Sequence, residues 1–120
     1  MTASSLNPGD TDLVRIEIIG DVPTIRLAAL GEVDSSSAPT LRTGLDEVLD
    51  SGVTDLTVDL TGVTFLDSAG LCVLAAAHRR AVRSDVRMRV VATSRAVIRP
   101  MQITGLFDLL HVVASEPGAG

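Results

Sequence analysis

Residues 58–71 read VDLTGVTFLDSAGL, and within this segment a strand pattern changes to a helix pattern. Apolar Leu56, Val58 and Leu60 alternate with polar residues, which predicts a strand, and a short loop then leads into a helix. Asp67 or Ser68 is placed to cap that helix. A helix N-terminus carries about +0.5 of partial charge and unpaired N–H groups, so a phosphate on Ser68 could be accommodated there. The junction is therefore a candidate charge switch.

The same reasoning extends along the chain. Alternating apolar residues predict strands over 13–19 and 24–30, joined as a hairpin, and two more over 56–60 and 88–92. Helical spacing and capping residues predict helices over 38–49, stopping at Gly52, over 69–83, and from Ser94 to Gly105. Pro100 should kink the third helix or delay its start, and a last strand is expected within 109–113.

This order of elements predicts an α/β fold, in which a small mixed β-sheet carries helices packed mainly on one face. At 120 residues the chain is long enough for one core. We expect a single domain over residues 13–114, with flexible tails at 1–12 and 115–120.

Composition narrows the functional classes. The net charge of −5 arises from 15 acidic residues against 10 arginines, without lysine, which disfavours a nucleic-acid or anionic membrane surface. The cluster of Arg79, Arg80 and Arg83 is expected to be a solvated helix face. Cys72 is the single cysteine, and we find no signal peptide and no apolar run of membrane-spanning length. A cytoplasmic protein with a protein partner is the expectation.

Catalysis is not expected, because the motifs that support it are missing. The chain has no lysine for a P-loop, no Gly-x-Ser-x-Gly, no Cys-x-x-Cys and no His-Glu-x-x-His. His78 and His111 lie in apolar patterns and are expected to be structural. Cys72 is expected to be a small packed residue, with redox sensing as the alternative. For Ser68, local chemistry alone favours a plain helix cap over a switch.

The segment 59–71 resembles the phosphorylation-site loop of STAS domains of the bacterial anti-sigma factor antagonist family. Gly31-Glu32-Val33-Asp34 is similar to the point where the second strand of that family meets its first helix, and Thr104-Gly105-Leu106-Phe107 to the end of its third helix. The resemblance extends from about Val14 to Val113. Two departures are Ala69, where the family often has a second hydroxyl residue, and Cys72, where it often has glycine.

The resemblance implies an anti-sigma factor antagonist, not an enzyme, that in its unphosphorylated form binds an anti-sigma factor and so releases a sigma factor. The partner it implies is a serine kinase that uses ATP and magnesium, with a separate serine phosphatase reversing the modification. Ser68 would be the phosphorylated residue, and the partner-binding candidates are Asp34, Asp67, Ala69, Gly70 and Leu71. No cofactor and no metal are expected for the chain itself.

Two alternatives remain at the level of sequence. The first is a STAS module that is not phosphorylated and acts as a scaffold or as a sensor of a nucleotide or other small ligand, which would need a pocket near the start of the second helix. The second is a hydrolase that uses Ser68 as nucleophile, for which no base is evident.

Overall fold

A computed structural model describes residues 13–114, and the expected tails at 1–12 and 115–120 lie outside them. The described chain forms a five-stranded mixed sheet in the order β1-β2-β3-β4-β5. The strands are β1 (Val14–Asp21), β2 (Thr24–Val33), β3 (Asp55–Leu66), β4 (Arg87–Val91) and β5 (Val112–Val113). β1 and β2 form an antiparallel hairpin, whereas β2 to β5 are parallel neighbours.

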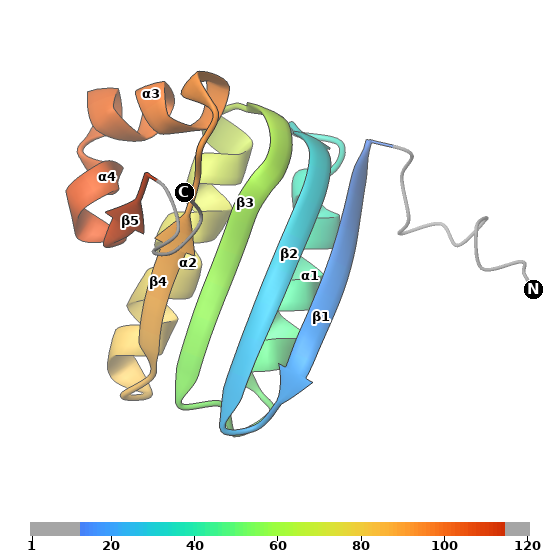
Figure 1. Cartoon of the computed structure of the whole chain (residues 1–120), viewed down its shortest axis with the longest axis vertical. Coiled ribbons are helices and arrows are strands. Elements are labelled where there is room, and N and C mark those ends of the chain that lie inside the picture. Colours follow the sequence, from blue (N-terminus) through green and yellow to red (C-terminus); the bar gives the residue numbers. More distant parts are fainter. Residues whose placement is uncertain (1–12, 115–120) are drawn as a thin grey trace, which may run out of the picture.

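Two long helices supply one layer of the molecule. α1 (Ala38–Leu49) and α2 (Ser68–Arg83) lie side by side behind the sheet in Figure 1. Fully buried leucines from the strands and from both helices form the core between the layers: Leu27, Leu41, Leu45, Leu56, Leu60 and Leu74. The expected α/β fold, with a small mixed sheet and helices mainly on one face, is confirmed.

β3 is longer than its alternating pattern predicts. The loop expected between the third strand and the second helix is instead strand as far as Leu66. The extension pairs with β2 through irregular register, with Leu30 opposite Gly62 and Glu32 opposite Phe65. Such bulges shift which side chains face inward, so strict alternation fails although the strand continues.

The C-terminal part departs further from expectation. α3 (Arg95–Thr104) begins directly after its cap Ser94 and contains Pro100, so the proline does not delay its start. A short helix α4 (Leu106–Leu109) follows Gly105, which has a φ of 81°. The expected strand over 109–113 is reduced to β5, and His111 lies in a turn rather than in a strand.

Candidate functional site

The start of α2 is anchored to the sheet by the backbone. The Asp67 N–H donates to the carbonyl oxygen of Val33, the last residue of β2, at 3.1 Å. Asp67 is the N-cap: its Oδ1 accepts hydrogen bonds from the N–H groups of Ala69 at 2.9 Å and Gly70 at 3.3 Å. The capping alternatives are thereby decided in favour of Asp67, and the expectation of a capping Ser68 is wrong.

Ser68 is the first residue of α2, and its side chain is exposed. Among residues 13–114 its hydroxyl makes no hydrogen bond with another protein group. The Asp67 carboxylate already occupies two N–H groups of the first turn, so fewer amides are free for an added phosphate than the sequence suggested. A phosphate on Ser68 would therefore extend into solvent beside a carboxylate.

Asp34 lies next to this junction, because β2 and β3 are parallel and end together with Val33 opposite Leu66. Its Oδ1 accepts hydrogen bonds from the Ser36 hydroxyl at 2.7 Å, the Ser36 N–H at 2.9 Å and the Ser37 N–H at 3.1 Å. The bonds from Ser36, chiefly from its hydroxyl, hold the pKa of Asp34 below its ordinary value. Asp34 thus shapes the turn into α1 and adds negative charge near Ser68.

The three residues after Ser68 mainly face the interior. Gly70 and Leu71 are buried, and Ala69 is half-buried against the core. A Cβ atom on Gly70 would lie 2.4 Å from Leu66 Cδ1 and 2.8 Å from Val33 Cγ1. The glycine therefore lets the first turn of α2 approach β2 and β3 closely, which is a packing role within the chain.

Two further residues near Ser68 are exposed: Phe65, which was not singled out from the sequence, and Cys72, which was expected to be packed. Phe65 leaves 47% of its surface exposed three residues before Ser68. Cys72 is exposed on the second turn of α2, so the expectation of a packed cysteine is wrong. Continuing the alternation of Leu56, Val58 and Leu60 would have placed odd-numbered Phe65 on the outward face of the strand, so the sequence did contain a signal for its exposure.

The two histidines belong to a different part of the molecule. The rings of His78 on α2 and His111 after α4 have centroids 6.4 Å apart, tilted by 60°. His78 is half-buried, as expected for a structural residue, whereas His111 is exposed. Within the part of the chain that the structure describes, no three His, Cys, Asp or Glu side chains gather to hold a metal ion.

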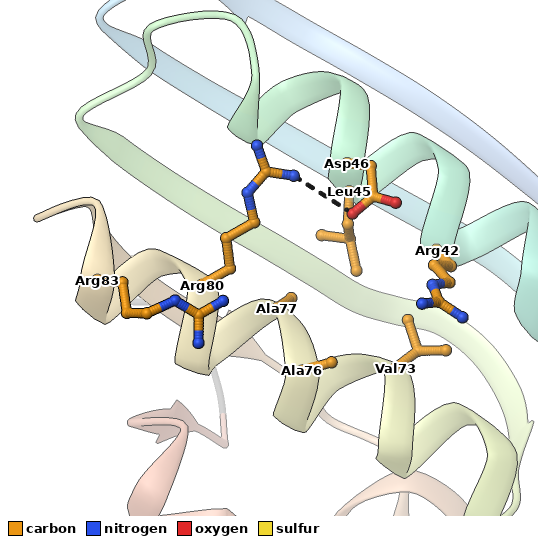
Figure 2. A pocket seen from close by; sticks show the side chains of 8 residues that line it. All are labelled: Arg42, Leu45, Asp46, Val73, Ala76, Ala77, Arg80 and Arg83. Carbon is orange, nitrogen blue, oxygen red and sulfur yellow. Dashed lines mark hydrogen bonds and ion pairs between the residues drawn. The ribbon is translucent and has the colours of Figure 1, made fainter.

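A shallow pocket lies between α1 and α2 (Figure 2). Arg80 of α2 extends across it to Asp46 of α1 at 3.5 Å and also contacts Asp50. Its lining comprises Arg42, Leu45, Asp46, Val73, Ala76, Ala77, Arg80 and Arg83. Neither Ser68 nor Asp67 belongs to this set, so the pocket is separate from the strand-to-helix junction.

Within the described part of the chain, no helix has the length and apolarity to cross a membrane.

The fold and the junction agree with a known family, since the STAS domain model matches residues 14–119. The chain therefore belongs to the STAS domain family. The proteins that it resembles include several anti-sigma factor antagonists.

Three of these proteins show how similar the chain is to them in sequence and in fold. The chain is 29% identical over 105 residues to an anti-sigma-B factor antagonist of Bacillus subtilis, covering 88% of this chain and 95% of the relative. It is 32% identical over 82 residues to an anti-sigma-B factor antagonist of Staphylococcus aureus, covering 68% and 76%. The crystal structure of an anti-sigma factor antagonist from Mycobacterium paratuberculosis matches with a TM-score of 0.80 and 28% identity over 87% of this chain and 88% of that chain.

The fold is also shared with SpoIIAA, an anti-sigma factor antagonist. Its unphosphorylated form matches with a TM-score of 0.70 and its phosphorylated form with 0.63, both at 18% identity. The alignments cover 82% and 83% of this chain, and 88% and 90% of the SpoIIAA chains. At this identity the likeness concerns the fold alone.

Proposed function

We propose that this protein is an anti-sigma factor antagonist that binds an anti-sigma factor when Ser68 is unmodified and releases it when Ser68 is phosphorylated. One observation carries the proposal: the exposed Ser68 hydroxyl, which makes no hydrogen bond to any other group of residues 13–114, lies on the first residue of α2, and the backbone anchors that helix start to β2. The anti-sigma-B factor antagonists among the relatives support the same role. The chain then acts as a binding protein and a kinase substrate rather than as an enzyme, in the cytoplasm.

The switch is electrostatic. A phosphate adds about −1.5 to −2 charges at pH 7. Asp67 and Asp34 already place carboxylates at this edge of the sheet, and the whole chain carries −5. An interface that covers Ser68 would have to desolvate the added charge beside existing ones, which opposes binding. Loss of affinity is therefore expected without a change of fold.

The binding surface we propose is centred on Ser68 and Phe65. Aromatic side chains are enriched at protein interfaces because they bury a large rigid area. Phe65 has 47% of its surface available. Ala69, Gly70 and Leu71 contribute through the shape of the helix start, and Asp34 and Asp67 through their charge. Replacing Phe65 by alanine should weaken binding of the anti-sigma factor about tenfold, whereas the exposed Val82→Ala on α2 should not.

The test uses the anti-sigma factor kinase of the same organism with ATP and magnesium. Mass spectrometry should find one phosphate, on Ser68, which Ser68→Ala abolishes and the exposed Thr64→Ala does not. Calorimetry should then give Ser68→Ala the affinity of the unmodified protein and Ser68→Asp at least about tenfold weaker binding. Thr43→Asp, on the exposed side of α1, is the charge-matched control. Equal affinities for Ser68→Ala and Ser68→Asp would overturn the switch.

The alternative of an unphosphorylated scaffold or small-ligand sensor has a distinct outcome in the same experiments. Ser68 would remain unmodified after incubation with kinase and ATP. A ligand would raise the melting temperature in a saturable manner. The pocket between α1 and α2 does not include Ser68, so ligand binding there would leave the proposed switch unexplained.

A further inference from the structure

β1 forms one edge of the sheet, and among residues 13–114 β2 is its only strand neighbour (Figure 1). Three apolar side chains in β1 or in the turn after it are exposed: Ile18 at 48%, Ile19 at 50% and Val22 at 44%. An edge strand with free backbone groups is a template for pairing with another strand. β1 is eight residues long and contains neither proline nor lysine, which commonly block such pairing.

Hydrogen bonding to β2 fixes which backbone groups face outward. The Glu32 N–H donates to the Leu13 carbonyl oxygen at 2.6 Å, and these two residues continue the register in which Val14 faces Gly31. Leu13 and Glu32 are therefore a directly hydrogen-bonded pair, and such pairs recur at every second residue. Along β1 the odd-numbered residues then bond to β2. The N–H and C=O groups of even-numbered Val14, Ile16, Ile18 and Gly20 point to the free edge.

We propose that β1 pairs antiparallel with β1 of a second copy of this chain, with the two-fold axis at Ile16. This register pairs the residues whose N–H and C=O groups point to the free edge: Ile16 is opposite Ile16, and Val14 is opposite Ile18. It also places Arg15 opposite Glu17 of the second copy, twice by symmetry. Both side chains are well exposed, at 78% and 45%, and lie 3.6 Å apart within one strand.

Charge distinguishes the neighbouring registers. An axis at residue 15 places Arg15 opposite Arg15, and one at residue 17 places Glu17 opposite Glu17, and like charges directly opposite are destabilising. An axis at Ile18 places Arg15 opposite Asp21 but Glu17 opposite Ile19, so the Glu17 carboxylate meets no cation. The Ile16 register gives both Arg15 and Glu17 a partner of opposite charge, and loss of the dimer in Glu17→Arg distinguishes it from the Ile18 register.

The contact is small. About seven residues from each copy would pair, which buries less than the roughly 1,200–2,000 Å² of stable interfaces. We therefore expect a weak dimer, populated at high protein concentration. The dimer edge is distinct from the Ser68 junction at the ends of β2 and β3, so this inference does not depend on the proposed function.

Sedimentation equilibrium over a concentration series tests the dimer in the full chain. Arg15→Glu and Glu17→Arg each create two like-charge contacts and should weaken dimerisation at least about tenfold. The double variant carrying both changes restores opposite pairs and should recover the wild-type affinity. Arg79→Glu makes the same charge change as Arg15→Glu on α2 and should have no effect. Circular dichroism confirms that each variant is folded.

Cross-linking tests the register. Arg15→Cys and Glu17→Cys proteins are prepared separately, each with Cys72→Ser to remove the native thiol. After oxidation, a mixture should give the disulfide between positions 15 and 17 in preference to either homodimer, since directly opposed residues have suitable Cα separations. The proposal is overturned by a monomer at protein concentrations of about 1 mM, by failure of the double variant to recover, or by predominant homodimer disulfides.

Discussion

At the scale of single residues, Asp67 and Ser68 have separate tasks at adjacent positions. Asp67 closes the first turn of α2 with its carboxylate, while Ser68 keeps its hydroxyl in solvent. Because the cap belongs to Asp67, phosphorylation of Ser68 leaves both capping hydrogen bonds in place. The division of tasks leaves Ser68 free for modification without loss of helix stability.

Removing the cap should therefore destabilise the protein. Asp67→Ala is expected to lower the free energy of unfolding by about 0.5–2 kcal/mol, because the N–H groups of Ala69 and Gly70 lose their acceptor. Asp67→Asn keeps an acceptor and should retain most of the stability. Urea unfolding measures both. A loss as large for Asp67→Asn as for Asp67→Ala would contradict the capping role.

Asp59 on β3 makes the stability depend on pH. Burial raises the pKa of its carboxyl, but hydrogen bonds from Thr61 and from Arg26, at 2.8 Å, outweigh burial and leave it below the ordinary 3.8. A folded-state pKa below the unfolded value means that the stabilisation is complete above that unfolded value and disappears as the pH falls through the folded one.

The free energy of unfolding should thus fall on acidification below about pH 4, and part of that fall should disappear in Asp59→Asn. Chemical unfolding at a series of pH values between about 2 and 6 measures it. Glu47→Gln, which removes an exposed carboxylate on α1, serves as control. If Asp59→Asn and wild type lost stability in parallel, the assignment would be wrong.

At the scale of elements, glycines control how closely each helix approaches the sheet. A Cβ atom on Gly44 of α1 would lie 3.1 Å from Cγ2 of Ile16, a half-buried residue on the edge strand. On Gly70 it would overlap Leu66 and Val33, both buried. The same substitution should therefore have different consequences in the two helices.

Gly70→Ala should destabilise the protein by about 1–3 kcal/mol, because buried side chains must move. Gly44→Ala should cost less or stabilise by up to about 1 kcal/mol, since alanine favours a helix and Ile16 can shift at the edge. Thermal unfolding of both variants checks the difference. Equal losses would show that helix position, not contact with the sheet, decides the effect.

Most elements could be predicted from the sequence, because their apolar periodicity was uninterrupted. The core face of α1 is an example, from Leu41 to Val48. The extension of β3 could not be predicted, since bulges around Gly62 break the alternation and depend on pairing with β2. The candidate site was also predicted only in part. The sequence indicated Ser68, but it could not show whether Asp67 or Ser68 caps α2, because Asp and Ser cap equally well.

At the scale of the whole molecule, the fold separates the proposed switch residue Ser68 from the core. Ser68 is exposed, and the residues that pack beneath it belong to β2, β3 and the first turn of α2. A negative charge at the first position of a helix is compatible with the helix dipole. Phosphorylation is therefore expected to alter what the surface binds and to leave the packing unchanged.

Ser68→Asp should accordingly leave the free energy of unfolding within about 0.5 kcal/mol of wild type, while weakening the anti-sigma factor complex. Urea unfolding and far-UV circular dichroism check the fold, and calorimetry checks the complex. A large loss of stability in Ser68→Asp would indicate a switch that acts through unfolding of the helix start.

The hydrogen bond from the Asp67 N–H to Val33 has a consequence for any enzyme that modifies Ser68. Many kinases bind a flexible, extended peptide in their active site. Ser68, in contrast, is held at the junction between strand β3 and helix α2. The modifying enzyme must accept the intact domain, so selectivity depends on three-dimensional shape rather than on a linear consensus. A synthetic peptide spanning residues 58–75 should be a far poorer substrate than the folded chain.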